Sequence, residues 1–324
     1  MAEFNPQEPL SPLADPVIGA IFCDVEHAGA AVASLAGAVF AKDDFSIGRI
    51  VSVTPQRYYK IPGERGVCID IEGRSDQNEY AIIEIQINTD PSILLRNLLG
   101  ASRIYAAKVP EGTHPRDLVK MTPKVLAINI LDYSLRDTRQ NKDYVQPVKL
   151  LYTKPPQETA LTQFAIYNIE LPKFREAAAD FGDKLYCWIY ALEKAHREKK
   201  TVEEVIKMTP QLQGFAKEDE GFRQFCEQYH RVASDPATRN DYYWWWIDMA
   251  RKDAEINYGV EKGHAKGLAE GRAEGLAEGR AEGLAEGRME ATLEAAKAIL
   301  ALGHTPEEVA KALQLPLADV KALQ

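Results

Sequence analysis

Two acidic residues on neighbouring predicted strands are the side chains in this sequence best placed to do chemistry. Asp70 lies in the segment GVCIDIE, and Glu84 and Gln86 lie in the segment YAIIEIQIN. Side chains alternate between the two faces of a strand, so these three residues can project from one side of a hairpin. If its turn centres near Gln77, Asp70 stands opposite Glu84, with Cβ atoms about 5 Å apart. Carboxylates that close repel each other unless a cation lies between them.

The cation that this arrangement predicts is Mg²⁺, or Mn²⁺ in its place. Mg²⁺ keeps several waters and is typically held by one or two carboxylates together with substrate phosphate. Asp70 and Glu84 supply the carboxylates, and the carbonyl group of Ile85 can add a third ligand. Such an ion activates a water and neutralises charge on a phosphodiester in the transition state. The alternative is an ordinary half-solvated hairpin, because acidic residues are common on the polar face of a strand.

The segment after the hairpin predicts a helix over residues 91–107 that carries two arginines. Pro91 stands near its start, and leucines recur at helical spacing. Arg96 and Arg103 are seven residues apart and therefore share a face. The fork of donors on arginine suits phosphate recognition, so these side chains can contact a nucleic acid. Surface ion pairing is the alternative interpretation for both.

The elements that must position these residues alternate between strand and helix in the first half of the chain. Apolar, β-branched runs predict strands, and an Ala- and Val-rich stretch after an Asp-Pro start predicts an opening helix. From about residue 174 to residue 258 the pattern is mostly helical. The predicted fold class is therefore α/β, with a mixed sheet flanked by helices and a mostly helical C-terminal region. The opening helix spans residues 15–40, and the strands span residues 47–54, 66–72, 80–88, 123–132 and 161–170.

The C-terminal part contains a low-complexity array in which Gly recurs every four residues. Each interior Gly costs a helix about 1 kcal/mol relative to Ala, so the array is predicted to be a linker or a conditional helix. Beyond it, Gly303 is a helix stop, and Thr305 with Glu308 forms a capping-box start. Together the patterns predict five segments: a disordered leader (1–14), a core (15–175), a helical extension (176–258), the Gly/Glu-rich repeat (259–290) and a small helical tail module (291–324).

Composition limits the cellular setting and the partners. The net charge is −9, so DNA contact requires a local basic groove, because the overall field of an acidic protein does not steer it to nucleic acid. The four cysteines are far apart and form no CxxC pair, which favours reduced thiols and argues against zinc or a disulfide framework. No signal-peptide pattern and no apolar run of about 18 residues is present. We therefore expect a cytoplasmic protein without membrane association.

Several segments, taken in order, resemble a known family. The stretches GVCIDIEG and AIIEIQIN, followed by LLRNLLGASRIYA, resemble the PD-(D/E)XK nuclease superfamily, and more closely its recombination-promoting nuclease and transposase-like branch. The later segments PKVLAINILDY and FAIYNIELPKF are similar to further parts of this branch, as are the Gly/Glu-rich repeat and the terminal ILALGHTPEEVAKAL. The likeness extends from about residue 15 to the end. No single motif is specific, but their order and spacing make the set so.

The resemblance implies a restriction-endonuclease-like core and Mg²⁺-dependent cleavage of DNA phosphodiester bonds. It implies that Asp70 and Glu84 ligate the metal, that Gln86 takes the place of the superfamily's Lys, and that Arg96 matches the Arg of the helix. Two departures matter: neutral Gln86 supplies no charge, and the opening helix lacks the Lys that the branch often carries after an Asp, here Asp15. A second hypothesis therefore stands beside the endonuclease: a catalytically inactive nuclease fold that acts as an oligomeric interaction scaffold through its C-terminal repeat and tail.

Overall fold

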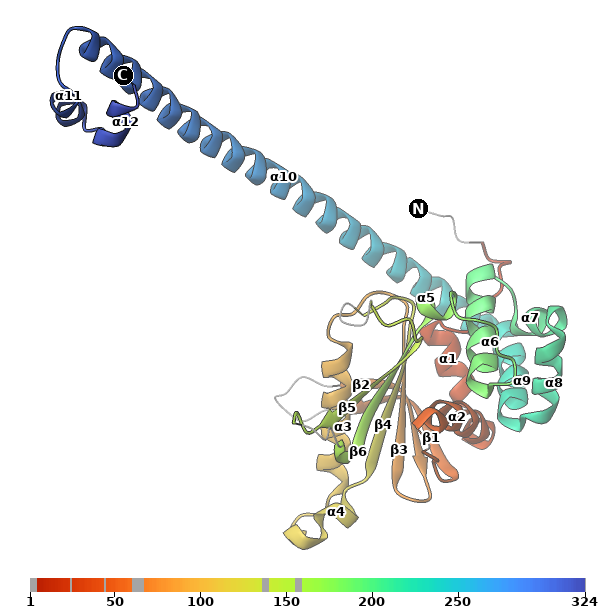
Figure 1. The fold of residues 1–324 in the computed structure, drawn as a ribbon. Helices are drawn as coiled ribbons and strands as arrows, with labels where there is room; N and C mark the ends of the chain where they lie inside the picture. The colour runs from red at the N-terminus through yellow and green to blue at the C-terminus, as the bar shows by residue number, and fades with distance from the viewer. Residues whose placement is uncertain are drawn as a thin grey trace. The chain divides into compact units, whose positions relative to one another are not determined.

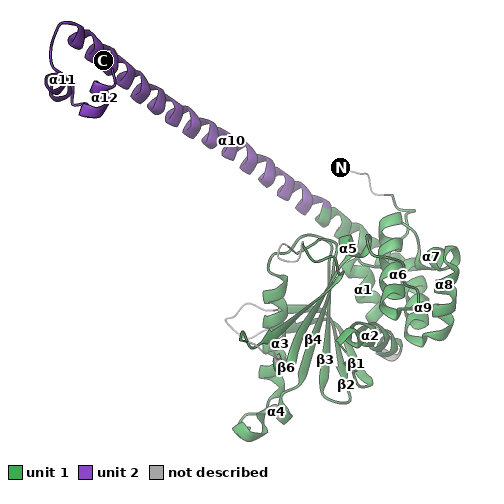
Figure 2. Cartoon of the chain, in the orientation of Figure 1, with its two compact units in different colours: residues 1–249 green, residues 250–324 purple. Residues whose placement is uncertain are grey.

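The computed structural model describes residues 5–23, 25–43, 45–59, 67–135, 140–154 and 159–323. The chain divides into two compact units, residues 1–249 and residues 250–324, which Figure 2 distinguishes by colour. The first unit is built around a six-stranded sheet with helices on both faces (Figure 1). The predicted fold class, a mixed sheet flanked by helices and followed by a mostly helical region, is confirmed.

The strands of the sheet are β1 (Ile50–Tyr59), β2 (Val67–Ser75), β3 (Glu79–Gln86), β4 (Lys124–Leu131), β5 (Val145–Leu151) and β6 (Thr159–Glu170). Their order across the sheet is β1-β2-β3-β4-β6-β5. Strands β3, β4 and β6 run parallel, whereas β1, β2 and β3 pair antiparallel, as do β5 and β6. The sequence did not predict β5, because this edge strand is mostly exposed and so has no apolar face to produce a period of two.

One face of the sheet is covered by α3 (Ile93–Lys108), as Figure 1 shows. Its residues Ala101 and Ile104 are fully buried against Tyr80 and Ile82 of β3. The turn that leads from this layer to β4 contains a short 3₁₀ segment, Pro115–Asp117, and α4 (Leu118–Met121). Helix α3 corresponds to the predicted helix over residues 91–107, and it carries both Arg96 and Arg103.

The opposite face carries the larger core, formed by helices from both ends of the first unit (Figure 1). The predicted opening helix over residues 15–40 is two helices, with a break between Phe22 and Val25. The remaining helices come from the segment predicted as an extension, and they bury their apolar stripes in the same core. The helices of this layer are α1 (Asp15–Phe22), α2 (Val25–Phe40), α6 (Lys184–Glu198), α7 (Val202–Met208), α8 (Pro210–Glu218) and α9 (Glu220–Ser234), and α5 (Leu171–Phe174) links β6 to them.

Close packing of α9 on α2 joins the helical extension to the sheet domain. At Gly221 an added Cβ atom would lie 2.2 Å from the carbonyl oxygen of Ala30 and 2.5 Å from the Cβ atom of Ser34. No side chain fits at those distances, so glycine is required for this approach. Asp219 caps α9 by accepting from the backbone N–H of Phe222 at 2.8 Å. The extension and the sheet therefore form one unit.

The N-terminal segment differs from its prediction. Leu10 and Leu13 are each 1% exposed, and the Tyr229 hydroxyl donates to the carbonyl oxygen of Leu10 at 2.6 Å. Ser11 also contacts Nδ1 of His196 on α6, with 2.7 Å between the two atoms. The prediction of a disordered leader is therefore wrong for residues 5–14, because its two leucines complete the larger core; residues 1–4 lie outside the described part of the chain.

The second unit contains most of α10 (Pro236–Ala301) and a small C-terminal bundle. The Gly/Glu-rich repeat is helical throughout, and its side chains are exposed. The bundle, α11 (Pro306–Leu313) and α12 (Leu317–Lys321), buries Ala296, Val309 and Val320. Gly303 has a φ of 96° and Thr305 makes both capping-box hydrogen bonds with Glu308, which confirms the predicted stop and start.

Among the described residues, no helix by itself combines the length and the apolar character needed to cross a membrane. A bent pair, residues 15–22 with residues 27–43, meets the length and composition criteria only when its two helices are taken together. Most apolar residues of this pair, from Val17 to Phe22 and from Ala28 to Phe40, lie in the larger core of the first unit.

Candidate active site

The register of the central hairpin places the two predicted acids opposite each other. The β2–β3 ladder pairs Ile71 with Ile83, and its turn is centred on Gln77, as the sequence predicted. One further step in this register brings Asp70 opposite Glu84. The last pair of the ladder is Ile71 with Ile83, so Asp70 and Glu84 lie one residue beyond its end.

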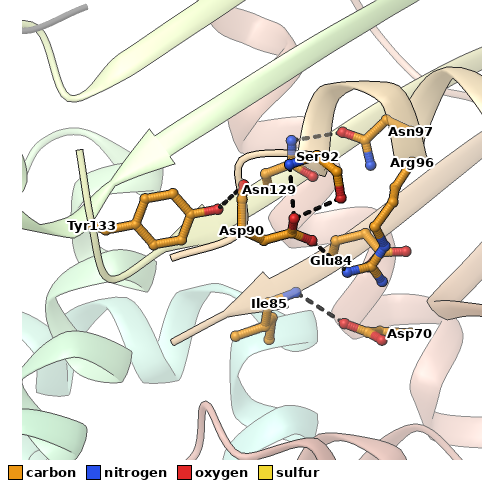
Figure 3. A network of polar contacts seen from close by, with 9 residues as sticks. All are labelled: Asp70, Glu84, Ile85, Asp90, Ser92, Arg96, Asn97, Asn129 and Tyr133. Carbon is orange, nitrogen blue, oxygen red and sulfur yellow. Dashed lines mark hydrogen bonds and ion pairs between the residues drawn. The ribbon is translucent and has the colours of Figure 1, made fainter. Parts of the chain in front are cut away.

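The two strands part at Asp70. Beyond Ile71, β2 continues along β1, whereas β3 continues along β4. The Asp70 carboxylate enters the gap and accepts a hydrogen bond from the backbone N–H of Ile85 at 3.0 Å (Figure 3). The Glu84 carboxylate in turn is hydrogen-bonded to the backbone of Asp70, which lowers its pKa against the larger effect of burial.

The predicted alternation of β2 fails at this point. Ile69 packs in the core under α3, whereas Ile71 packs in the core on the opposite face, although the sequence placed them on one face. The flanking pairs of the β1–β2 ladder put Gln56 across from Asp70, and Gln56 has a φ of 47°. A non-glycine residue in this conformation costs about 1–3 kcal/mol and is concentrated at functional sites. This irregularity of β1 lies directly across from the point where β2 changes face.

A small cavity of about 10 Å³ opens beside Asp70, roughly the room of one water molecule. Asp15, the first residue of α1, brings a third carboxyl group to its wall, and its charge raises the pKa of both Asp70 and Glu84. The sequence singled out Asp15 only as a helix start and did not consider Gln56. The cavity is lined by Asp15, Ile18, Gly19, Gln56, Asp70 and Ile85.

Burial sets the charge state of the acidic pair. The pKa of Glu84, whose side chain is 3% exposed, is raised first by burial and then by the charge of Asp70, against the opposing charge of Arg96. Burial likewise raises the pKa of Asp70, against the hydrogen bond from Ile85 and the charge of Arg96. Both lie above the ordinary range near 4. The pair therefore resists carrying two negative charges unless a further cation neutralises them.

Arg96 is brought to the pair by α3. Its Nη2 atom lies 3.1 Å from Oε2 of Glu84, and its Nη1 atom lies 3.1 Å from Oδ2 of Asp90 (Figure 3). Arg103 is two helical turns further on, about 10 Å along the axis, and is partly buried. The structure thus unites Asp70, Glu84 and Arg96, and it places Arg103 away from them.

Gln86 is the last residue of β3 and is partly exposed. Its carbonyl oxygen accepts from the backbone N–H of Asp132 at 3.0 Å, which fixes the end of the strand. In the described residues no hydrogen bond joins its amide to Asp70, Glu84 or Arg96. Two residues beyond Glu84 on one strand, it lies beside the acidic pair without contacting it.

A buried row of amides supports the site from the side of α3. Glu84, Asn129 and Asn168 are in register across β3, β4 and β6. The Nδ2 atom of Asn129 donates to Oδ1 of Asn97 on α3 at 2.7 Å (Figure 3). It also donates to Oδ1 of Asn168 at 2.7 Å. These asparagines were not among the predicted site residues. A signal was present, because LAINIL and AIYNIE each carry one Asn within an apolar run.

The donor set fits Mg²⁺ or Mn²⁺. Asp70, Glu84 and the carbonyl of Ile85 offer hard oxygen ligands, and Mg²⁺ is typically held by one or two carboxylates with its remaining positions filled by water and phosphate. Burial raises the pKa of both acids, so a cation beside them would favour their charged forms. Within the described residues no group of three or more His, Cys, Asp and Glu side chains is arranged to hold a metal. The set therefore does not suit a closed, all-protein site such as structural zinc.

The first unit thus combines a mixed sheet with a central hairpin whose strands part beside two carboxylates. The family model of the PD-(D/E)XK nuclease family transposases matches residues 21–244, more than two thirds of the chain. The chain therefore belongs to this family. No curated protein and no solved structure matches it.

Proposed function

We propose that this protein is a DNA endonuclease of the recombination-promoting and transposase-like type that depends on Mg²⁺ or Mn²⁺. The observation that carries the proposal is the position of the half-buried Asp70 carboxylate opposite the buried Glu84 carboxylate, where β2 and β3 separate. Family membership supports a nuclease-type function. The phosphodiester backbone of DNA is the substrate class that an arginine beside such a pair suits.

Each residue of the site has a distinct part in this proposal. Asp70, Glu84 and the carbonyl of Ile85 would hold the ion, which when bound supplies an activated water and neutralises charge on the phosphate. Arg96 offers a planar fork of donors that can bind two phosphate oxygens. The amide of Gln86 can orient a water or a phosphate oxygen by hydrogen bonding, but it supplies no charge. The positive charge that the superfamily's Lys would bring therefore falls to Arg96.

Cleavage of supercoiled plasmid in the presence of Mg²⁺ or Mn²⁺ tests this function. We expect wild-type protein to nick or linearise the plasmid, and we expect EDTA or Asp70→Asn to abolish cleavage. Asp76→Asn is the matched control, because Asp76 is an exposed turn residue whose ion pair with Arg49 spans 3.6 Å. Cleavage that persists at the wild-type rate in the Asp70 variant would exclude the proposed site.

A second function, oligomeric assembly, is supported by the exposed apolar residues of α10. Tyr258, Val260, Leu268 and Leu276 are each at least 65% exposed. A long helix with exposed apolar side chains and an interior glycine at every fourth position gains little stability by itself. We therefore propose that copies of the chain associate through this helix and the tail. Removal of residues 259–324 should lower the number of chains per particle, obtained from the mass measured by light scattering, and an unchanged number would exclude this role.

The cellular compartment is proposed to be the cytoplasm. Cys23, Cys68, Cys187 and Cys226 are all unpaired, as expected where thiols stay reduced. Fractionation of cells that express the tagged protein would test this assignment, and recovery outside the cytoplasmic fraction would contradict it.

A further inference from the structure

Arg96 forms an ion pair with Glu84, the most deeply buried carboxylate of the site. The side chain of Glu84 is 3% exposed, and its Oε2 atom lies 3.1 Å from Nη2 of Arg96. Arg96 thus partly offsets a buried carboxylate whose charge would otherwise be costly. A divalent cation on Glu84 would take over this task, and the two positive charges would repel at such short range.

A second carboxylate holds the other edge of the guanidinium group. The Nη1 atom of Arg96 lies 3.1 Å from Oδ2 of Asp90. Asp90 is itself fixed at the turn before α3: its Oδ1 atom accepts from the backbone N–H of Ser92 at 2.8 Å and from the Ser92 hydroxyl at 2.6 Å. Its carbonyl oxygen accepts from the Tyr133 hydroxyl at 3.2 Å. Asp90 therefore keeps its position whether or not Glu84 remains paired (Figure 3).

The exposure of the three side chains differs in a way that allows Arg96 to move. Glu84 is 3% exposed and Asp90 is 21% exposed, whereas Arg96 is 34% exposed. The guanidinium group can therefore turn toward solvent without opening the core, while Glu84 cannot leave its place. An arginine shared by two carboxylates can lose one partner and stay tethered by the other.

We propose that Arg96 is an internal counter-ion that a divalent cation displaces from Glu84, and that Asp90 is the positioning residue that keeps Arg96 at the site after this exchange. The inference rests on the proposed function for the metal site. It goes beyond that function because it assigns Arg96 a role before substrate arrives and gives a role to Asp90. The released guanidinium group is then available to a phosphate.

Calorimetric titration of the full chain with Mn²⁺ tests the exchange. We expect Arg96→Met to bind Mn²⁺ at least fivefold more tightly than wild type, because the competing charge is gone. Arg103→Met, which removes the same charge two turns away on the same helix, should change the affinity less than twofold. Circular dichroism spectra that match wild type establish that each variant is folded.

The role of Asp90 is tested by a double-mutant cycle. Asp90→Asn leaves Arg96 with Glu84 as its remaining carboxylate partner in this network, so we expect at least threefold weaker Mn²⁺ binding. In the Arg96→Met background the same substitution should change the affinity less than twofold, because Asp90 acts through Arg96. An equal effect in both backgrounds would assign Asp90 a general electrostatic role and overturn this part of the proposal.

The outcomes separate this inference from the proposed endonuclease. Mn²⁺ binding with the expected variant pattern, but without DNA cleavage, refutes the endonuclease and leaves the counter-ion exchange supported. Unchanged or weaker Mn²⁺ binding by Arg96→Met refutes the exchange even if DNA is cleaved. Absence of Mn²⁺ binding in wild type and in every variant refutes both the metal site and the exchange.

Discussion

Replacing Asp70 with Asn should stabilise the metal-free protein at alkaline pH while it removes the proposed activity. The asparagine keeps a side-chain oxygen that can accept the Ile85 N–H bond, but it carries no charge. An acid whose pKa is raised by folding binds more protons in the folded state than in the unfolded state. Its favourable contribution is therefore complete below the unfolded pKa near 4 and is lost as pH rises through the folded pKa.

The size of this effect follows from the burial of Asp70. Burial is the largest of the causes that raise its pKa from 3.8 to about 6. Each unit corresponds to about 1.4 kcal/mol, so ionisation of Asp70 costs the folded state about 2–3 kcal/mol at pH 8. The substitution also removes the charge that helps to raise the pKa of Glu84, which acts in the same direction.

Urea denaturation in EDTA at pH 4 and pH 8 measures the difference. We expect the two proteins to have similar free energies of unfolding at pH 4 and the Asp70→Asn variant to be about 2–3 kcal/mol more stable at pH 8. Mn²⁺ at about 100 times its dissociation constant should then add about 2.7 kcal/mol to wild type and nothing to the variant. A variant that is less stable than wild type at pH 8 would refute the reasoning that burial disfavours the charged form of Asp70.

Two further substitutions test the packing that supports the site. Gly221→Ala should lower the free energy of unfolding by several kcal/mol, because the new Cβ atom would overlap α2. The control Gly214→Ala, where an added Cβ has no neighbour within 4 Å, should raise that free energy by up to about 1 kcal/mol. Equal effects in chemical denaturation would contradict the close α2–α9 contact. Asn129→Leu should cost about 1–3 kcal/mol, because the amide oxygens of Asn97 and Asn168 lose their donor; a variant as stable as wild type would show that the buried amide row is dispensable.

The register of the site could be predicted from the sequence because it depends on local rules. Two apolar runs joined by a polar stretch set the turn at Gln77, and the turn sets Asp70 opposite Glu84. The helix that carries Arg96 follows from its spacing of leucines. These features need no knowledge of the rest of the chain.

Features that depend on tertiary packing could not be predicted in this way. The positive φ of Gln56 and the reversal of faces between Ile69 and Ile71 arise where β2 leaves β3, which no local pattern encodes. Asp15 reaches the cavity because α1 packs across the end of the hairpin.

The prediction of a disordered N-terminal leader was wrong for a related reason. Its composition is that of a disordered leader, but Leu10 and Leu13 find a core built by helices about 200 residues later in the chain.

The most direct test of the central claim is a crystal structure of the protein soaked with Mn²⁺, with anomalous diffraction used to locate the ion. The account predicts one strong peak within coordinating distance of a carboxylate oxygen of both Asp70 and Glu84, with Arg96 no longer paired with Glu84. A peak at another place, or an unchanged Arg96–Glu84 pair with no ion beside it, would contradict the account.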